Sequence, residues 1–157
     1  MKKILITTGG SGGHVIPSLS IYDALKDDFE VKIVTDLRGS KYINNVDYNF
    51  SLIDVPNIFS NILLLPYNLI KFLTAILKSY HYLKRNNFSI LISTGGYMSL
   101  PLCIASKLLN LQIYIFEPNS VLGRANKFII NYAKKIICYD NDLRNISKKF
   151  LNKIYLV

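Results

Sequence analysis

The sequence predicts one α/β domain built on a doubly wound, Rossmann-like parallel sheet. Short apolar runs rich in β-branched residues alternate with longer segments of helical periodicity, and 50% of the 157 residues are hydrophobic. Because nearly every position in these runs is apolar, helices should cover both faces of the sheet, with right-handed crossovers. A chain of this length can bury roughly 70% of its unfolded surface around one core.

Seven strands are expected, with helices filling most of the gaps between them. The strands are placed at residues 4–7, 31–35, 48–53, 89–93, 112–115, 135–139 and 153–157. The first run follows Met1-Lys2-Lys3 directly and ends in glycines, which is typical of a strand and not of a secretory signal. Residues 57–66 are the one region that does not fit a single element.

The positive charge is concentrated in residues 55–157. The net charge is +9, and residues 55–116 contain five basic side chains and no acidic one. Such a surface suits an anionic partner, such as acidic lipid headgroups, a pyrophosphate or a nucleic acid. The alternative is a set of lysines that only solvates the surface of a chain rich in Ile, Asn and Lys.

The cysteines and histidines give no sign of a metal site. Cys103 and Cys138 lie far apart in apolar segments, where a free cysteine packs like a small hydrophobic residue. His14 and His81 are the only histidines, and no ligand cluster is formed around them. We therefore expect a reduced, cytoplasmic protein without a bound metal.

The first strand leads into a glycine-rich loop, TTGGSGGHVIP at residues 7–17, which enters a helix. Ligands bind open sheets of this kind at the carboxyl ends of the strands. Four glycines let the backbone approach a ligand closely, and the free N–H groups of the helix start favour an anion such as a pyrophosphate. The loop lacks the third glycine of the dinucleotide fingerprint, because Val15 stands there, and a merely tight turn is the alternative.

Two further loops follow later strands. The block STGGYMSLP at residues 93–101 repeats the glycine-rich design, so two such loops should face one crevice. The block EPNSVLGRAN at residues 117–126 follows the fifth expected strand, and its Glu117 is the only acidic residue between Asp54 and Asp140. Taken alone, Tyr97 in the second loop is more typical of packing than of function.

These blocks together resemble the N-terminal domain of the MurG family, inverting glycosyltransferases of family 28 with the GT-B fold. The first block is highly specific and the other two support it. The resemblance implies transfer of N-acetylglucosamine from UDP-N-acetylglucosamine to a lipid-linked muramyl-pentapeptide acceptor in peptidoglycan synthesis. Residues 1–157 would form the acceptor-binding domain, without the donor-binding domain. No cofactor is implied, and the enzyme would lie peripherally on the cytoplasmic face of the inner membrane.

The resemblance also implies roles for individual residues. His14 would be the general base on the acceptor's sugar hydroxyl, since a neutral imidazole can accept that proton, although a role in orienting the loop is the alternative. Glu117 is the second catalytic candidate. Phe116 and Pro118 stand where the family usually has His and Gln, so the contacts beside Glu117 differ. The implied substrate-binding residues are Ser11, Gly12, Gly13, Thr94, Gly95, Gly96, Tyr97 and Asn119.

Residues 58–85 predict an amphipathic helix rather than a membrane span, because Pro66, Asn68 and several lysines interrupt the apolar run. Such a helix could lie at an anionic membrane surface with its lysines toward the headgroups, or simply pack on the core. The sequence leaves three other functions to consider. They are a non-catalytic subunit that anchors and presents the acceptor, a nucleotide-binding protein with Asp36 as ribose ligand, and an RNA-binding protein. The last two are disfavoured by the missing fingerprint and by the absence of aromatic stacking blocks.

Overall fold

The computed structural model describes residues 1–55, 62–140 and 142–157, and this part of the chain forms a seven-stranded, all-parallel sheet. The strand order is β3-β2-β1-β4-β5-β6-β7. The strands are β1 Lys3–Thr7, β2 Glu30–Thr35, β3 Phe50–Leu52, β4 Ile90–Ser93, β5 Gln112–Glu117, β6 Ala133–Cys138 and β7 Ile154–Leu156. The predicted fold class and all seven predicted strands are confirmed, with small differences at the strand ends.

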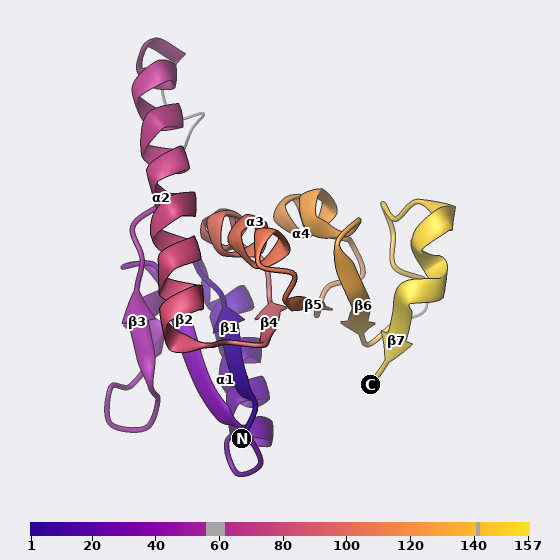
Figure 1. Ribbon diagram of the computed structural model, residues 1–157. Helices are drawn as coiled ribbons and strands as arrows, with labels where there is room; N and C mark the ends of the chain where they lie inside the picture. Colours follow the sequence, from indigo (N-terminus) through magenta and orange to yellow (C-terminus); the bar gives the residue numbers. More distant parts are fainter. Residues whose placement is uncertain (56–61, 141) are drawn as a thin grey trace.

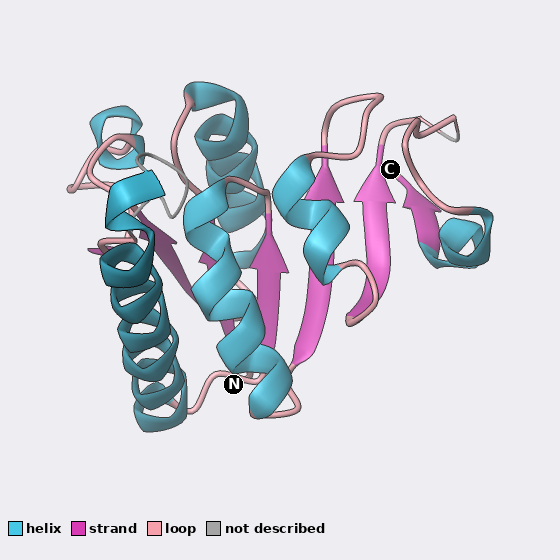
Figure 2. Ribbon diagram, turned by 90° about the horizontal axis from the view of Figure 1, so that it is seen from above, coloured by secondary structure: helices cyan, strands magenta, loops and turns pink. Residues whose placement is uncertain are grey.

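Helices lie on both faces of the sheet (Figure 2). The helix α1, Gly12–Leu25, covers one face, while α2, Leu65–Asn86, α3, Leu100–Leu108, and α4, Arg124–Ile129, cover the other. Short 3-10 helices complete the described part: η1 Gly39–Tyr42, η2 Ile62–Leu64, η3 Tyr97–Ser99 and η4 Lys148–Lys153. The expected amphipathic segment is helical from residue 65 on, and its residues 58–61 lie outside the described part of the chain.

Alternating side chains of the strands build two separate cores. On β1, Ile4 and Ile6 pack with Val15 of α1, whereas Leu5 between them packs with the α2 and α3 layer. This alternation follows from the two-residue period of a strand, and both faces are apolar because both are covered. Leu5 and Ile6 have no exposed surface at all. The continuous hydrophobic runs in the sequence are the direct result of this double burial.

The strand order reverses at β1, and this reversal positions the loops discussed below. The chain runs from β1 outward to β2 and β3, then returns through α2 to β4 on the other side of β1. The loops that leave β1 and β4 are therefore neighbours, and the Thr94 N–H donates to the Thr7 carbonyl at 3.1 Å. Such a switch point is where open parallel sheets bind their ligands.

The helix α2 is long and only partly covered. Its buried positions, Asn68, Phe72, Ala75, Ser79 and Leu83, recur every three or four residues and face the rest of the fold. It ends at Asn86 and is capped by Asn87, whose left-handed φ of 55° and N–H bond to the Leu83 carbonyl are typical of a helix C-terminus. Figure 1 shows its first turns projecting beyond the sheet. Among the described helices, none has the length and hydrophobicity needed to cross a bilayer.

One lysine ties the last strand to α4. The Nζ of Lys153, the last residue of η4 directly before β7, donates to the carbonyl oxygens of Ile130, Asn131 and Ala133 at 3.0, 3.1 and 2.6 Å. Carbonyls that follow a helix have no partner within that helix, and a cation is favourable at this end. Lys153 therefore joins the edge of the sheet to the turn after α4.

Candidate functional site

The two glycine-rich loops touch through their backbones at the switch point. Gly96 has a φ of +86°, and a Cβ added there would lie 2.6 Å from the Gly9 carbonyl oxygen. Gly95 has a φ of +99°, and a Cβ there would lie 3.1 Å from the His14 ring. L-residues with side chains rarely adopt such φ values. These positions of the second loop therefore need glycine for both conformation and space.

His14 lies in the first turn of α1 and is held by the second loop. Its Nδ1 is 2.9 Å from the carbonyl oxygen of Thr94, and the Thr94 hydroxyl donates to the His14 carbonyl at 2.9 Å. A carbonyl oxygen can only accept, so Nδ1 must carry the proton in this contact. The neutral ring then has its lone pair on Nε2. The half-buried His14 is thus oriented by one nitrogen and can accept a proton at the other.

Glu117 is fully buried at the end of β5, where both carboxylate oxygens accept hydrogen bonds. Oε1 accepts from the side chain of Asn119 at 2.9 Å and from its N–H at 3.3 Å. Oε2 accepts from the Gly123 N–H at 2.9 Å and from Asn126 Nδ2 at 3.0 Å. A buried carboxylate with this many donors fixes the third loop and the start of α4.

A short hydrogen-bond chain connects this carboxylate with the second loop. Asn126, which donates to Glu117, accepts from the Ser93 hydroxyl at 3.4 Å, and that hydroxyl accepts from the Gly95 N–H at 3.3 Å. Ser93 and Asn126 are not among the site residues predicted from the sequence. A signal was present only for Ser93, the one polar residue of the apolar strand β4, because Asn126 lies between Arg124 and Lys127 in α4, although both side chains are buried.

Asp36 at the end of β2 fixes the first glycine loop from the other side. Its Oδ1 accepts from the N–H groups of Gly10 and Gly39 at 3.0 and 2.9 Å, and Oδ2 accepts from Arg38 Nε at 3.1 Å. Burial raises the pKa of Asp36, but these hydrogen bonds outweigh it, so the pKa lies below its usual value. Both carboxylate oxygens of Asp36 thus bind groups of its own chain, which disfavours a role of Asp36 as ribose ligand.

The remaining predicted residues lie along the same edge of the sheet. Ser11 precedes α1 without a side-chain hydrogen bond to the helix, and Gly12 and Gly13 form its first turn, where N–H groups have no helical partner. Tyr97 packs its ring 5.9 Å from that of Phe72. Tyr97 also lines a cavity of about 340 Å³ together with Asp36, Arg38 and Asp54. Among the described residues no group of His, Cys, Asp and Glu could hold a metal ion.

The fold and the site define a Rossmann-like ligand-binding domain with two glycine loops and an oriented histidine at its switch point. Residues 4–138 match the model of the glycosyltransferase family 28 N-terminal domain. The chain belongs to this family of glycosyltransferases, as the sequence blocks suggested.

Individual relatives agree with this assignment. A UDP-N-acetylglucosamine–N-acetylmuramyl-(pentapeptide) pyrophosphoryl-undecaprenol N-acetylglucosamine transferase of Pelagibacter ubique is 48% identical over 99% of this chain and 44% of its own length. The transferase of the same name from Rickettsia typhi is 40% identical, over 99% of this chain and 40% of its own length. The crystal structure of Acinetobacter baumannii MurG has the same fold, with a TM-score of 0.82, 22% identity and coverage of 100% of this chain and 46% of that one. The chain thus spans less than half the length of these relatives.

The contact between the loops gives a direct test. Gly96→Ala should lower the free energy of unfolding by about 2 kcal/mol or more, because the new Cβ meets the Gly9 carbonyl at an unfavourable φ. Gly13→Ala is the control, since a Cβ there lies 3.8 Å from the Ser11 hydroxyl and meets nothing closer. Urea denaturation of both variants measures the difference. Equal stability of the two would contradict the close approach.

Asp36 should make stability depend on acid pH. Its pKa is lowered in the folded protein, so its contribution is complete above the unfolded value, about 4, and is lost as the pH falls through the folded value. Asp36→Asn should therefore reduce the free energy of unfolding at pH 7 by about 1 kcal/mol or more, and less at pH 3. Urea titrations across this range, with the exposed Asp28→Asn as control, measure it. If the difference in the free energy of unfolding between wild type and Asp36→Asn stayed constant with pH, the ionised carboxylate of Asp36 would not be the form that stabilises the protein.

Proposed function

We propose that this chain is the acceptor-binding half of an enzyme that transfers N-acetylglucosamine from UDP-N-acetylglucosamine to lipid-linked N-acetylmuramyl-pentapeptide. The observation that carries the proposal is the orientation of His14, whose Nδ1 is occupied by Thr94 while Nε2 remains to accept a proton. The names of the relatives from Pelagibacter ubique and Rickettsia typhi describe the same reaction. The match to the Pelagibacter ubique relative covers 99% of this chain, which supports assigning the same reaction to it.

In this reaction the sugar hydroxyl of the acceptor attacks the anomeric carbon of N-acetylglucosamine. The new bond forms between the hydroxyl oxygen and that carbon, the bond to UDP breaks with inversion, and UDP leaves with the electron pair. The hydroxyl proton passes to His14 Nε2. Gly12, Gly13, Gly95 and Gly96, with the hydroxyl of Ser11, would receive the acceptor's diphosphate at the start of α1. The Thr94 hydroxyl, which already donates to the His14 carbonyl, would instead position this loop.

Glu117 fits a positioning role in this proposal better than direct proton transfer. Its carboxylate has no exposed surface and is surrounded by donors from Asn119, Gly123 and Asn126. It would hold Asn119 and the third loop where the acceptor binds. The UDP-N-acetylglucosamine site would belong to the part of the relatives that this chain does not match.

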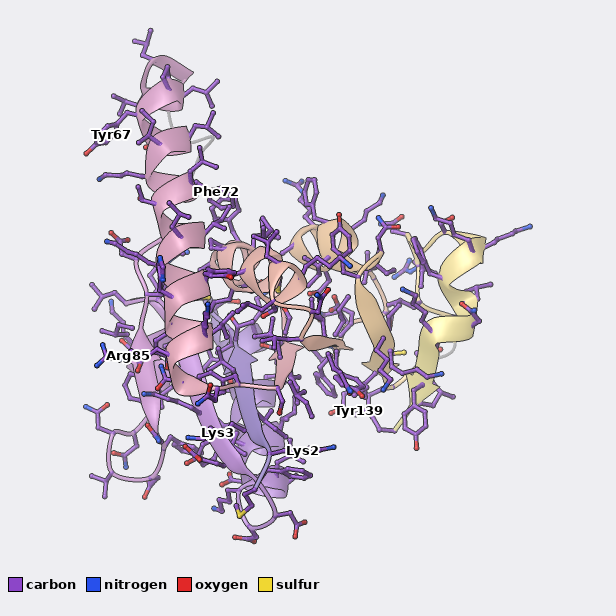
Figure 3. All side chains as sticks on the ribbon, in the orientation of Figure 1. Lys2, Lys3, Tyr67, Phe72, Arg85 and Tyr139 are labelled. Atoms are coloured by element: carbon purple, nitrogen blue, oxygen red, sulfur yellow. The ribbon has the colours of Figure 1, made fainter. Side chains whose placement is uncertain are left out.

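We further propose that the protein works at the cytoplasmic face of the inner membrane, with α2 against the lipid. The outward side of its first turns is apolar, since Leu69, Ile70, Leu73 and Leu77 are 48%, 62%, 52% and 60% exposed. Lys71 stands among them, 4.6 Å from the ring of Tyr67. Figure 3 shows Tyr67 on the projecting end of the helix. An apolar face with interleaved lysines suits an anionic bilayer surface. The same face supports a second candidate function, a non-catalytic subunit that presents the acceptor.

A chimera tests the catalytic proposal. In it, this chain replaces the matching part of the Pelagibacter ubique relative, and transfer of radiolabelled N-acetylglucosamine to the lipid-linked acceptor is measured. His14→Ala should lower kcat by a factor of about 10² to 10⁴ while the fold persists, because the proton acceptor is removed. His81→Ala, on the exposed side of α2, is the control.

Each result of this assay separates the alternatives. A His14→Ala chimera with near-normal kcat would exclude His14 as the base and leave it the role of orienting the loop. A chimera that binds acceptor but transfers nothing, although the parent relative is active, would favour the presenting subunit.

Vesicle binding tests the membrane proposal. Ile70→Glu combined with Leu73→Glu should abolish cosedimentation with phosphatidylglycerol vesicles, because two charges replace apolar contacts at the interface. Val46→Glu is the matched control, since Val46 is 88% exposed in the loop before β3. The wild-type chain should bind phosphatidylcholine vesicles less, and high salt should weaken its binding to the anionic ones. Unchanged binding of the double variant would refute the assignment of this face.

A further inference from the structure

The segment that follows β2 lies against the first glycine loop. A Cβ on Gly12 would lie 3.1 Å from the ring of Tyr42, and a Cβ on Gly10 would lie 3.7 Å from an Nη atom of Arg38. Arg38 directly precedes η1, and Tyr42 is its last residue. Neither is among the site residues predicted from the sequence. The loop that is proposed to bind an anion is therefore flanked by an aromatic ring and a guanidinium.

Arg38 is the one cation among the described side chains nearest to this loop. The other side chains that a Cβ on the loop's four glycines would meet are those of Ser11, Asp36, Tyr42 and Met98. The N–H groups and the dipole at the start of a helix carry only partial charges, whereas each phosphate of a diphosphate carries a full negative charge. A guanidinium beside the loop supplies the full positive charge that the backbone lacks.

Asp36 holds the guanidinium of Arg38 by one edge and leaves the other edge free. Asp36 Oδ2 accepts from Arg38 Nε at 3.1 Å, and no described residue accepts a hydrogen bond from the two Nη groups. Asp36 Oδ1 accepts from the Gly10 N–H at 3.0 Å, so one carboxylate fixes both the loop and the arginine. The planar fork of an arginine matches the oxygens of a phosphate. The Nη edge of Arg38 can therefore donate to an anion at Gly10.

A purely structural role explains Arg38 less well. Its side chain is 75% exposed, and exposed ion pairs contribute little to stability. Asp36 also has two backbone donors, the N–H groups of Gly10 and Gly39, and these hold the loop without Arg38. The Nε contact orients an arginine at the ligand-binding edge of the sheet, and such preorganisation favours the binding of an anion.

The neighbouring cavity indicates which side of the guanidinium faces the anion. Arg38 lines the cavity of about 340 Å³ together with Asp36 and Asp54. Two carboxylates make the inside of this cavity unfavourable for an anion. The favourable side of Arg38 is therefore the side toward Gly10, next to the start of α1, where N–H groups have no helical partner.

We infer that Arg38 is a further diphosphate-binding residue of this site and that Asp36 positions it, an inference that rests on the function proposed above. The Nη groups of Arg38 donate to the phosphate oxygens, while the N–H groups of the loop bind the same diphosphate. The proposed reaction involves two diphosphates, one in the lipid-linked acceptor and one in UDP-N-acetylglucosamine. Arg38 is assigned to the diphosphate of the acceptor, because the loop beside it is the one that receives the acceptor.

The experiment measures KM for each substrate on the chimera described above. Arg38→Gln should raise KM for the lipid-linked acceptor about tenfold or more, because charge-assisted hydrogen bonds are lost. The value of kcat should change little, since the contact lies away from the reacting hydroxyl and is made equally in the ground and transition states. KM for UDP-N-acetylglucosamine should stay the same.

Arg85→Gln is the matched control for the loss of charge. Arg85 is exposed in the last turn of α2, which leads into the amino end of β4, so it lies at the opposite edge of the sheet from the loops (Figure 3). Its KM for the acceptor should equal that of the wild type. The urea midpoints of both variants should also equal the wild-type midpoint, because both side chains are exposed.

Arg38→Lys separates charge from shape. A lysine keeps the positive charge but cannot bond Asp36 through one edge and a phosphate through the other, so KM for the acceptor should rise less than in Arg38→Gln. Four results would overturn the assignment. They are an unchanged KM for the acceptor in Arg38→Gln, an equal rise in Arg85→Gln, a rise in KM for UDP-N-acetylglucosamine alone, and a lower urea midpoint in Arg38→Gln that accounts for the loss.

Failure of the proposed function would look different. If the wild-type chimera transferred no sugar, calorimetric titration of this chain alone with inorganic pyrophosphate at low salt would still test the anion site. Binding that persists in Arg85→Gln and weakens about tenfold or more in Arg38→Gln would support the role of Arg38. Equal binding by both variants and the wild type, or no binding to the wild-type chain, would overturn it.

Discussion

The close approach of the first two glycine loops is the constraint on which the rest of the site depends. Gly96 can pass the Gly9 carbonyl only because Gly96 has no side chain, and a side chain on Gly9 would collide with Met98 just after the second loop. That approach brings Thr94 within hydrogen-bond distance of both the ring and the backbone of His14. A larger residue at either position would separate the loops, and the histidine would lose the contact that selects its tautomer. Backbone geometry at the switch point therefore determines which nitrogen of His14, the third residue of α1, can accept a proton.

Two carboxylates stabilise this arrangement from opposite sides, and both act on their own chain. Asp36 accepts from the backbone of the first loop, while Glu117 holds the third loop and reaches the second through Asn126 and Ser93. Each carboxylate replaces the water it would bind in an open loop with fixed N–H donors, which reduces the freedom of the loops. A site of this kind is largely ordered before any ligand arrives, which lowers the entropic cost of binding.

The sequence was sufficient for the fold and for the loops, but not for the bonds that join them. Strands buried on both faces leave continuous apolar runs, so even the short edge strand β3 was predicted, although three residues too long. The glycine loops were recognisable because their composition is local. The pairing of Asp36 with Gly10, and of Ser93 with Asn126, joins residues 26 and 33 positions apart, and no periodicity encodes such contacts. The roles of the ten candidate site residues stay predictions until variants are measured.

The lysine that directly precedes β7 has a mechanical consequence. Lys153 donates hydrogen bonds to three carbonyl oxygens just after α4. The same helix contains Asn126, whose side chain donates to the buried Glu117 of the third loop. β7 could therefore move away from α4 only if all three hydrogen bonds of Lys153 were broken. The last strand of the sheet is thus linked by hydrogen bonds to the loop that follows β5, so a displacement at this edge would be transmitted to the third loop, thirty or more residues earlier in the chain.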